Sequence, residues 1–354
     1  MTERLLIWII CLCQPLSAIA EPPILDPTLV SGSAEHPAHV LIVHDPDACR
    51  AFTPRPEIIK RMVDCGITNF TGKGTVALAW SSLVSTNDTV GIKVFAAPGR
   101  NSGTRPSVAA AVVQGLLEAK LSPRQIIIWD RQMLDLRLAG FFELAEGFGI
   151  RVMSSEAAGY DENVPYDPPA PLLGQLAWGD LEFGRKGEAI GRRSYVSKLL
   201  TKEITKIINV TPMLRHNYAG VAGNLYGLAV GSVDNTMRFE NNPQYSSAWL
   251  ATAVPEIYNL PALADRVVLN IVDALISQYE GGTTGRLHYS RTLNELRFSK
   301  DPVALDVLSF EELERQRGRL NSSDSTNVLE LFQNASVLDL GVSDIRRIQV
   351  ERIQ

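Results

Sequence analysis

Apolar and polar positions follow two different periods along the chain, and stretches of the two kinds alternate. Short runs of apolar, β-branched residues are typical of strands buried in a parallel sheet, whereas apolar residues three and four positions apart are typical of helices. The pattern predicts strands at residues 39–44, 88–95, 125–130, 150–153, 204–210 and 266–273. It predicts helices at residues 56–63, 75–83, 106–117, 134–147, 195–200 and 301–320. This alternation predicts an α/β sandwich, in which helices cover both faces of a mainly parallel sheet.

A stretch rich in proline and glycine, residues 160–180, divides this pattern and allows two subdomains. A long loop and a joint between subdomains are both compatible with such a composition. We therefore expect six segments: a signal peptide (1–20), an N-terminal arm (21–38), a first α/β half (39–159), the joint (160–180), a second α/β half (181–321) and a C-terminal extension (322–354).

The first twenty residues differ from the rest of the chain. Residues 5–12 form a short apolar run, Pro15 interrupts it, and the small residues Ala18 and Ala20 follow. The run is too short to span a bilayer comfortably, and the layout is typical of a secretory signal peptide cleaved near Ala20. We expect export to the periplasm or the extracellular space; a retained N-terminal anchor is the alternative. No later stretch is long and apolar enough for a transmembrane helix.

Charge and cysteine content narrow the function classes. The 354 residues include 34 basic and 39 acidic side chains, for a net charge of -5. This mild acidity argues against a general binder of nucleic acid or of anionic membranes, which needs a basic surface. After the predicted signal peptide, the chain contains only Cys49 and Cys65. These two residues either form a disulfide or remain as buried free thiols. Because the chain has no CxxC motif, an iron–sulfur cluster or a zinc ribbon is not expected.

Polar residues collect where the predicted strands end. In open α/β sheets, ligands gather at the carboxyl ends of the strands. The strand at 204–210 is expected to pass into a loop, residues 211–217, and the other strands carry or end in charged residues. The polar residues expected at this edge are Lys93, Asp130, Arg131, Arg215, His216, Asn217 and Asp273.

Three of these residues form the candidate catalytic group. His216 titrates in a range that suits proton transfer near neutral pH, and Lys93 and Asp130 would act beside it. Lys93 is equally compatible with a solvated position, and Asp273 with the cap of a helix that starts at Ala274. Asp130 or Asp273 would also suit a divalent metal ion, although the sequence identifies no metal.

The strongest local pattern runs from residue 215 to residue 238. Glycines at 220, 223, 227 and 231 let a backbone pack or approach a ligand closely. Arginines nearby suit a carboxylate or a phosphate, which a guanidinium holds with two charge-assisted hydrogen bonds. The alternative is a helix packed through its small residues. The candidate ligand-binding residues are Arg131, Arg215, Asn217, Asn235, Arg238 and Asp273.

Several of these motifs, in this order, resemble the domain-of-unknown-function 362 family. The similar segments are 90–94, 126–131, 208–221, 231–238, 273–282 and 300–306, and together they span roughly residues 40–320. The family usually has a lysine, one spacer residue and a histidine before the glycine, whereas here Arg215 directly precedes His216. A lysine common in the glycine stretch is replaced by the region 224–226. The resemblance implies a shared anion site without lysine-dependent chemistry, and no iron–sulfur module.

Three functions remain open. An enzyme acting on a small anionic metabolite would use His216 for proton transfer. A non-catalytic ligand-binding protein of the cell envelope would use the same cleft through its arginines. A surface-interaction protein is expected if the polar groups at 215–238 serve only as caps. Serine-hydrolase and zinc-protease functions are disfavoured, because neither Gly-x-Ser-x-Gly nor His-Glu-x-x-His occurs.

Overall fold

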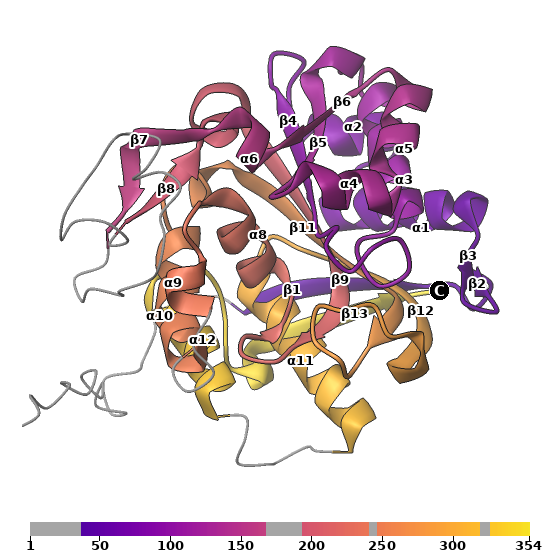
Figure 1. Ribbon diagram of the computed structural model, residues 1–354. Helices are drawn as coiled ribbons and strands as arrows, with labels where there is room; N and C mark the ends of the chain where they lie inside the picture. The colour runs from indigo at the N-terminus through magenta and orange to yellow at the C-terminus, as the bar shows by residue number, and fades with distance from the viewer. Residues whose placement is uncertain (1–36, 168–192, 241–245, 319–325) are drawn as a thin grey trace, which may run out of the picture. The chain divides into compact units, whose positions relative to one another are not determined.

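A single central sheet organises the protein. The computed structural model describes residues 37–167, 193–240, 246–318 and 326–354, all within one unit that begins at Gly32 (Figure 1). In spatial order the strands are β13 (Ile348–Ile353), β1 (Ala38–His44), β12 (Ser290–Ser299), β11 (Val267–Gln278), β9 (Lys206–His216), β4 (Val90–Val94), β5 (Ile126–Asp130) and β6 (Arg151–Ser154). Only β12 runs antiparallel to its neighbours in this row. The predicted α/β fold with a mainly parallel sheet is confirmed.

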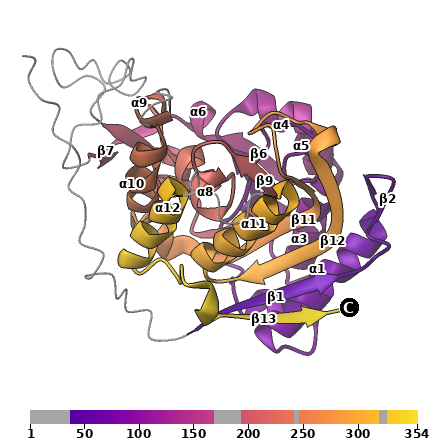
Figure 2. The same cartoon turned by 90° about the horizontal axis from the view of Figure 1, so that it is seen from below.

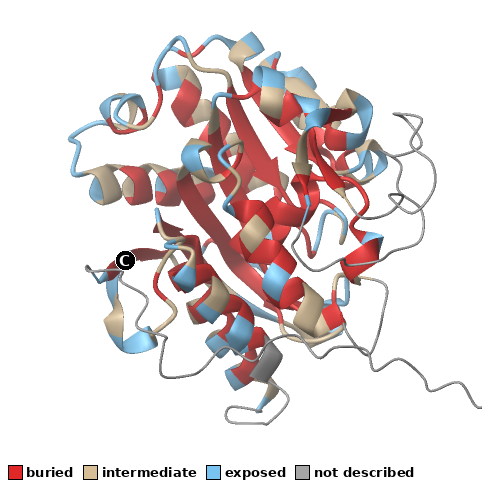
Figure 3. Ribbon diagram, turned by 90° about the vertical axis from the view of Figure 1, so that its left-hand side faces the viewer, coloured by how far each residue is buried: buried red, intermediate tan, exposed pale blue. Residues whose placement is uncertain are grey.

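Helices cover both faces of the sheet (Figure 3). Alternate strand residues belong to the two layers. Ile126 and Ile128 belong to one buried cluster, and Ile127 and Trp129 belong to the other. The first layer contains α1 (Pro56–Thr71), α2 (Val76–Ser81), α3 (Pro106–Glu118), α4 (Met133–Ala139) and α5 (Phe141–Phe148). The second contains α8 (Asn224–Ser232), α10 (Ser246–Tyr258), α11 (Pro302–Arg317) and α12 (Thr326–Val337).

Smaller elements lie at the ends of the sheet. Strand β10 (Gly220–Val221) folds back on the end of β9. Two short antiparallel pairs are β2 (Cys49–Arg50) with β3 (Thr53–Pro54), and β7 (Tyr160–Tyr166) with β8 (Ser194–Ser197). The short helices α6 (Ser155–Ala158) and α9 (Met237–Glu240) lie near β7 and β8 in Figure 1.

Helix ends follow local sequence signals. Pro56, Pro106 and Pro302 each begin a helix, since proline needs no hydrogen-bond acceptor there and has the right φ. Asp301 caps α11, and its Oδ1 accepts the Ala304 N–H at 2.8 Å. The predicted helix at 134–147 is interrupted at Gly140, whose φ of 91° ends α4 before α5 begins.

Three further predicted elements differ from the observed ones. Residues 195–200 are not a helix: β8 occupies Ser194–Ser197, and a π-helical turn follows at Leu199–Glu203. The strand predicted at 204–210 continues to His216, so the expected loop at 211–217 is mostly strand. The strand predicted to end at Asp273 continues to Gln278, and no helix starts at Ala274. Both strands extend because strand pairing continues there: the end of β9 pairs with β11 and β10, and the end of β11 pairs with β12.

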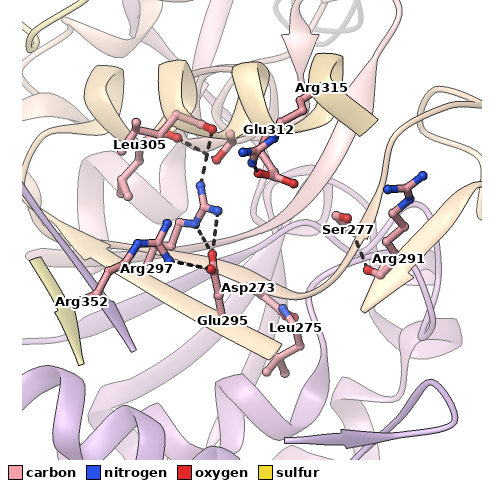
Figure 4. A network of polar contacts seen from close by, with 12 residues as sticks. Asp273, Leu275, Ser277, Arg291, Glu295, Arg297, Leu305, Glu312, Arg315 and Arg352 are labelled. Carbon is pink, nitrogen blue, oxygen red and sulfur yellow. Dashed lines mark hydrogen bonds and ion pairs between the residues drawn. The ribbon is translucent and has the colours of Figure 1, made fainter. Parts of the chain in front are cut away.

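The C-terminal segment is part of the sheet. Strand β13 pairs in parallel with β1 at the edge of the sheet (Figure 2). Its Arg352 and the β12 residue Arg297 both form ion pairs with Glu295 (Figure 4).

Cys49 and Cys65 are free thiols. No helix in the described ranges is long and apolar enough to cross a membrane. The predicted signal peptide, nearly all of the arm and most of the joint fall outside those ranges.

Candidate functional site

A buried ion pair joins the carboxyl ends of β4 and β5. Lys93 is fully buried, and its Nζ donates to Asp130 Oδ1 at 2.8 Å and to the Val94 carbonyl at 2.6 Å. The second Asp130 oxygen accepts the Ala96 N–H at 2.7 Å, and Oδ1 also accepts the Arg131 N–H at 2.8 Å. Burial lowers the pKa of Lys93, and the Asp130 carboxylate opposes that shift. The pair is therefore held rigidly by backbone groups of both strands.

Aromatic rings and a glycine enclose the Lys93 ammonium. Its Nζ lies 5.9 Å from the centre of the Phe95 ring and 5.4 Å from that of Trp129. Helix α8 passes over the lysine at Gly231, where a Cβ would lie only 2.3 Å from Lys93 Cε. The close approach that the glycine spacing predicted is thus made here, to a side chain of the sheet.

A hollow of about 160 Å³ lies beside this pair. Its wall comes from the loop after β4, the β5–α4 connection, α8 and Thr283. Its polar lining residues are Asp130, Arg131, Gln132, Asp135, Tyr226 and Thr283. Burial, and then the nearby Asp130 carboxylate, raise the pKa of Asp135. The hollow therefore presents groups of both charges to a small ligand.

Arg131 and Tyr226 share a carboxylate at the rim. Tyr226 donates its hydroxyl hydrogen to Glu240 Oε1 at 2.5 Å. Arg131 Nη1 lies 3.7 Å from Glu240 Oε2, and the Arg131 side chain is 32% exposed. That separation is longer than a normal hydrogen bond, so a ligand anion can approach the guanidinium in competition with Glu240.

His216 lies behind Tyr226 and does not line the hollow. The centres of the two rings are 4.2 Å apart. The His216 Nδ1 accepts the N–H groups of Ala219 at 2.9 Å and Tyr218 at 3.2 Å. Burial, and then the neighbouring Arg215, lower the pKa of His216 to about 3. The imidazole is therefore neutral near pH 7, with its proton on Nε2.

Two other candidate residues are held by partners inside the fold. Arg215 donates through Nη1 to the His216 carbonyl at 2.6 Å and the Gly220 carbonyl at 2.9 Å, and its Nε lies 2.9 Å from Glu314. The Asp273 carboxylate accepts from Arg105 at 2.8 Å, so it anchors the loop after β4. Arg215 thus holds the end of β9, whereas Asp273, in the middle of β11, holds the loop after β4.

The remaining candidates lie near the β7–β8 hairpin or at the surface. Arg238 is buried and donates to Ser194 Oγ at 2.9 Å. Asn235 adopts a left-handed φ of 50° and donates to the Arg193 carbonyl at 2.9 Å. Asn217 is exposed beyond the end of β9. Of the nine predicted site residues, Asp130 and Arg131 thus line the hollow, and Lys93 lies buried behind its wall, paired with Asp130.

A polar row that was not predicted from the sequence crosses the sheet on the α8 side. Lys93, Asn209, Asn270 and Ser299 are neighbours in register on β4, β9, β11 and β12. Asn209 Nδ2 donates to the Asn224 carbonyl at 3.0 Å and to Asn270 Oδ1 at 3.2 Å. Lys93, Asn209 and Asn270 are each a single polar residue within an apolar run, and this pattern is the sequence signal from which the row could have been predicted.

The first turn of α8 is also fixed by a buried acid. Asp306 of α11 accepts the N–H groups of Asn224 at 2.7 Å and Leu225 at 2.9 Å. A Cβ at Gly223 would lie 2.2 Å from Asp306 Oδ1, so glycine is needed there. This cap sets the position of Tyr226, which the sequence interpretation also missed. Tyr226 and Val230 are four residues apart, a spacing that places both on the same face of a helix. This spacing was the signal available in the sequence.

Comparison with known proteins places these features in a family. The model of the DUF362 family, described as a domain of unknown function, matches residues 90–311. The chain belongs to this family. The DUF362 match runs from the start of β4 into α11 and so includes the ion pair, the hollow and α8.

One similar solved structure is that of a protein from Thermotoga maritima. It is 11% identical to this DUF362 chain, with a TM-score of 0.41, and the match covers 77% of the chain. The chain spans 61% of the length of that protein. No curated protein sequence matches the chain. Among the residues that the structure describes, no group of three or more His, Cys, Asp or Glu side chains is arranged to hold a metal ion.

Proposed function

We propose that this DUF362 protein binds a small anionic molecule in the hollow beside Lys93 and Asp130. The observation that carries the proposal is the buried ion pair in contact with the wall of that hollow. Removing two charges from water is unfavourable even when they pair. Buried ionisable groups with perturbed pKa values beside a concavity are typical of functional sites.

Arg131 is the group that would hold the anion. Its guanidinium is partly exposed at the rim, and its nearest carboxylate is 3.7 Å away. A planar guanidinium can grip a carboxylate or a phosphate with two hydrogen bonds. Gln132 and Thr283 add neutral polar side chains to the same wall. The volume of about 160 Å³ limits the enclosed part of the ligand to a few heavy atoms.

A catalytic function is the second candidate, and one observation favours it. The lowered pKa of Lys93 increases the share of its free amine, which accepts a proton. Lys93, whose partner Asp130 lines the hollow, is therefore a better candidate for proton transfer than His216, which is outside that lining and whose pKa of about 3 makes it a weak base near pH 7. In the binding function, the same lysine only orients Asp130.

Export is part of the proposal and is supported by the sequence of the first twenty residues. The protein would act outside the cytoplasm after cleavage near Ala20. N-terminal sequencing of the protein purified from its own host is expected to begin at Glu21. A chain that still begins at Met1 would contradict cleavage.

Native mass spectrometry of the same purified protein tests the binding proposal. A co-purifying anionic molecule is expected, and its affinity is then measured by calorimetry. Arg131→Gln should weaken that affinity about tenfold or more, because a charge-assisted pair is lost. Arg124→Gln is the matched control, since Arg124 is exposed just before the start of β5, whereas Arg131 follows the end of β5. Equal effects of the two substitutions, or no bound molecule, would refute the proposal.

A further inference from the structure

A second, larger groove adjoins the hollow. Its volume is about 550 Å³, and it is lined by residues 98–102, after β4, and by residues 285–288, between β11 and β12. The same two segments contribute Ala97 and Thr283 to the first hollow. They meet at Gly285, where a Cβ would lie 2.9 Å from the Pro98 carbonyl oxygen.

The groove is positively charged in a protein whose net charge is -5. Arg100, Arg286 and His288 line it, and no aspartate or glutamate does. All three side chains are exposed. Within the described ranges, none of the three forms an ion pair with a carboxylate. Their donors are therefore available to an anion from solution.

A buried hydroxyl in the lining points to a ligand independently of the charge. Ser102 is 5% exposed, and its Oγ has no hydrogen-bond partner among the described residues. Leaving a buried hydroxyl unsatisfied is unfavourable. Gly285 approaches it closely, with a Cβ position 3.3 Å from Ser102 Oγ. An oxyanion in the groove would accept the hydrogen bond that the protein does not supply.

Hydrogen bonds fix the loop that carries Arg100 and Ser102. The Gly103 N–H donates to the Gly99 carbonyl at 2.9 Å. Arg105, which is paired with Asp273, donates to the Asn101 carbonyl at 3.2 Å. A loop fixed before binding loses little conformational entropy when a ligand arrives.

We propose that this groove binds the phosphate group of a small phosphorylated molecule. Two guanidinium groups, one hydroxyl and one imidazole supply more donors than a carboxylate accepts, and they suit a tetrahedral oxyanion. The groove is larger than a bare phosphate needs, and Pro98 and Leu287 provide apolar surface for the organic part. This assignment does not depend on what the first hollow binds.

Calorimetric titration with glycerol phosphate tests the assignment, with chloride used to keep the ionic strength constant. Saturable binding is expected, and it should be weaker for inorganic phosphate and for sulfate. Arg100→Gln and Arg286→Gln should each raise the Kd about tenfold. Ser102→Ala should raise it several-fold without lowering the Tm in chloride, since it removes an unsatisfied hydroxyl. Arg124→Gln should leave the Kd unchanged.

Four results would overturn the assignment. Glycerol phosphate that binds no better than chloride would show that no site exists. An Arg124→Gln effect as large as that of Arg100→Gln would show a general charge effect. Inorganic phosphate or sulfate that binds as tightly as glycerol phosphate would exclude the phosphorylated class. A loss with Arg131→Gln alone would place the anion in the first hollow and not in the groove.

Discussion

Lys93 on β4 donates to Asp130 on β5 across 2.8 Å, and the two side chains are 0% and 6% exposed. The register pairs Lys93 with Trp129, so the ion pair runs diagonally between neighbouring strands. Backbone N–H groups of Ala96 and Arg131 complete the coordination of the carboxylate. The geometry thus ties the loop after β4 to the end of β5, where the two segments enter the wall of the hollow.

Lys93→Met should lower the free energy of unfolding by about 3–5 kcal/mol, because it leaves Asp130 buried without its cation. Urea unfolding monitored by circular dichroism measures the loss. Combining Lys93→Met with Asp130→Asn should recover part of it, since the amide oxygen still accepts a backbone N–H. A single Lys93→Met variant that loses less than about 1 kcal/mol would mean that the pair is not buried in solution.

Gly231→Ala should destabilise the protein by about 1–3 kcal/mol through overpacking against Lys93. The added Cβ would lie 2.3 Å from Lys93 Cε, and Asp130 Oδ1 is 3.4 Å away. Gly147→Ala is the matched control, because Gly147 lies in α5 with nothing within 4 Å of a Cβ. Alanine favours a helix by up to about 1 kcal/mol over glycine, so the control should be neutral or stabilising. Similar thermal shifts for both variants would contradict the packing argument.

Local patterns were sufficient to predict β4 and β5, whose carboxyl ends lie at the hollow. Lys93 and Asp130 lie at the ends of strands whose apolar runs are short and clearly bounded. Because neighbouring parallel strands end at the same edge, the pattern alone indicated that these residues meet.

The ends of β9 and β11 could not be predicted in the same way. Pairing with neighbouring strands continues past residue 210 and past Asp273, and a local window does not contain those neighbours. Arg215 and Asp273 therefore lie within paired strands and not in a loop. The partners of the glycines, Lys93 for Gly231 and Asp306 for Gly223, likewise depend on contacts between distant segments.

Two buried groups should make stability depend on pH in opposite directions. Burial raises the pKa of Asp306 from 3.8 to about 7, so the native state binds the extra proton between these values. The contribution of Asp306 to the free energy of unfolding is on the order of 4 kcal/mol in total. It is complete below about pH 4 and is lost as the pH rises through 7. Asp301, with a pKa raised to about 6, acts in the same direction.

His216 acts in the other direction. Its pKa falls from 6.5 to about 3 on folding, so the unfolded chain binds the extra proton between these values. The contribution of His216 to the free energy of unfolding is on the order of 5 kcal/mol in total. It is complete above about pH 6.5 and is lost as the pH falls. In the wild type the His216 effect therefore opposes the effects of Asp306 and Asp301.

Single substitutions separate the two effects. Urea unfolding is measured at several pH values between 4 and 7. Stability should rise with pH in Asp306→Asn and fall with pH in His216→Gln, when each is compared with the wild type. Asparagine accepts through one oxygen only, so Asp306→Asn also loses stability at every pH, and the slope is the informative quantity. Parallel curves for all three proteins would show that neither group titrates as inferred.

Glu295 is expected to be the residue that attaches the C-terminal strand to the sheet. Its Oε2 accepts from Arg297 at 2.7 Å on β12, and its Oε1 accepts from Arg352 at 2.9 Å on β13 (Figure 4). Arg297 is buried, with a side chain 5% exposed, whereas Arg352 is 61% exposed. Burial alone would disfavour the Arg297 charge, so its pairing with Glu295 is needed.

Glu295→Gln should therefore cost about 3–5 kcal/mol of unfolding free energy, since it leaves a buried guanidinium without a carboxylate. Arg352→Gln should cost less than about 1 kcal/mol, because it removes only an exposed ion pair. Hydrogen exchange of the β13 amides, measured beside urea unfolding, reports whether the strand detaches. Faster exchange in Glu295→Gln than in Arg352→Gln is expected. Equal losses in both variants would mean that the ion pair to β13, and not the buried Arg297, carries the stability of this edge.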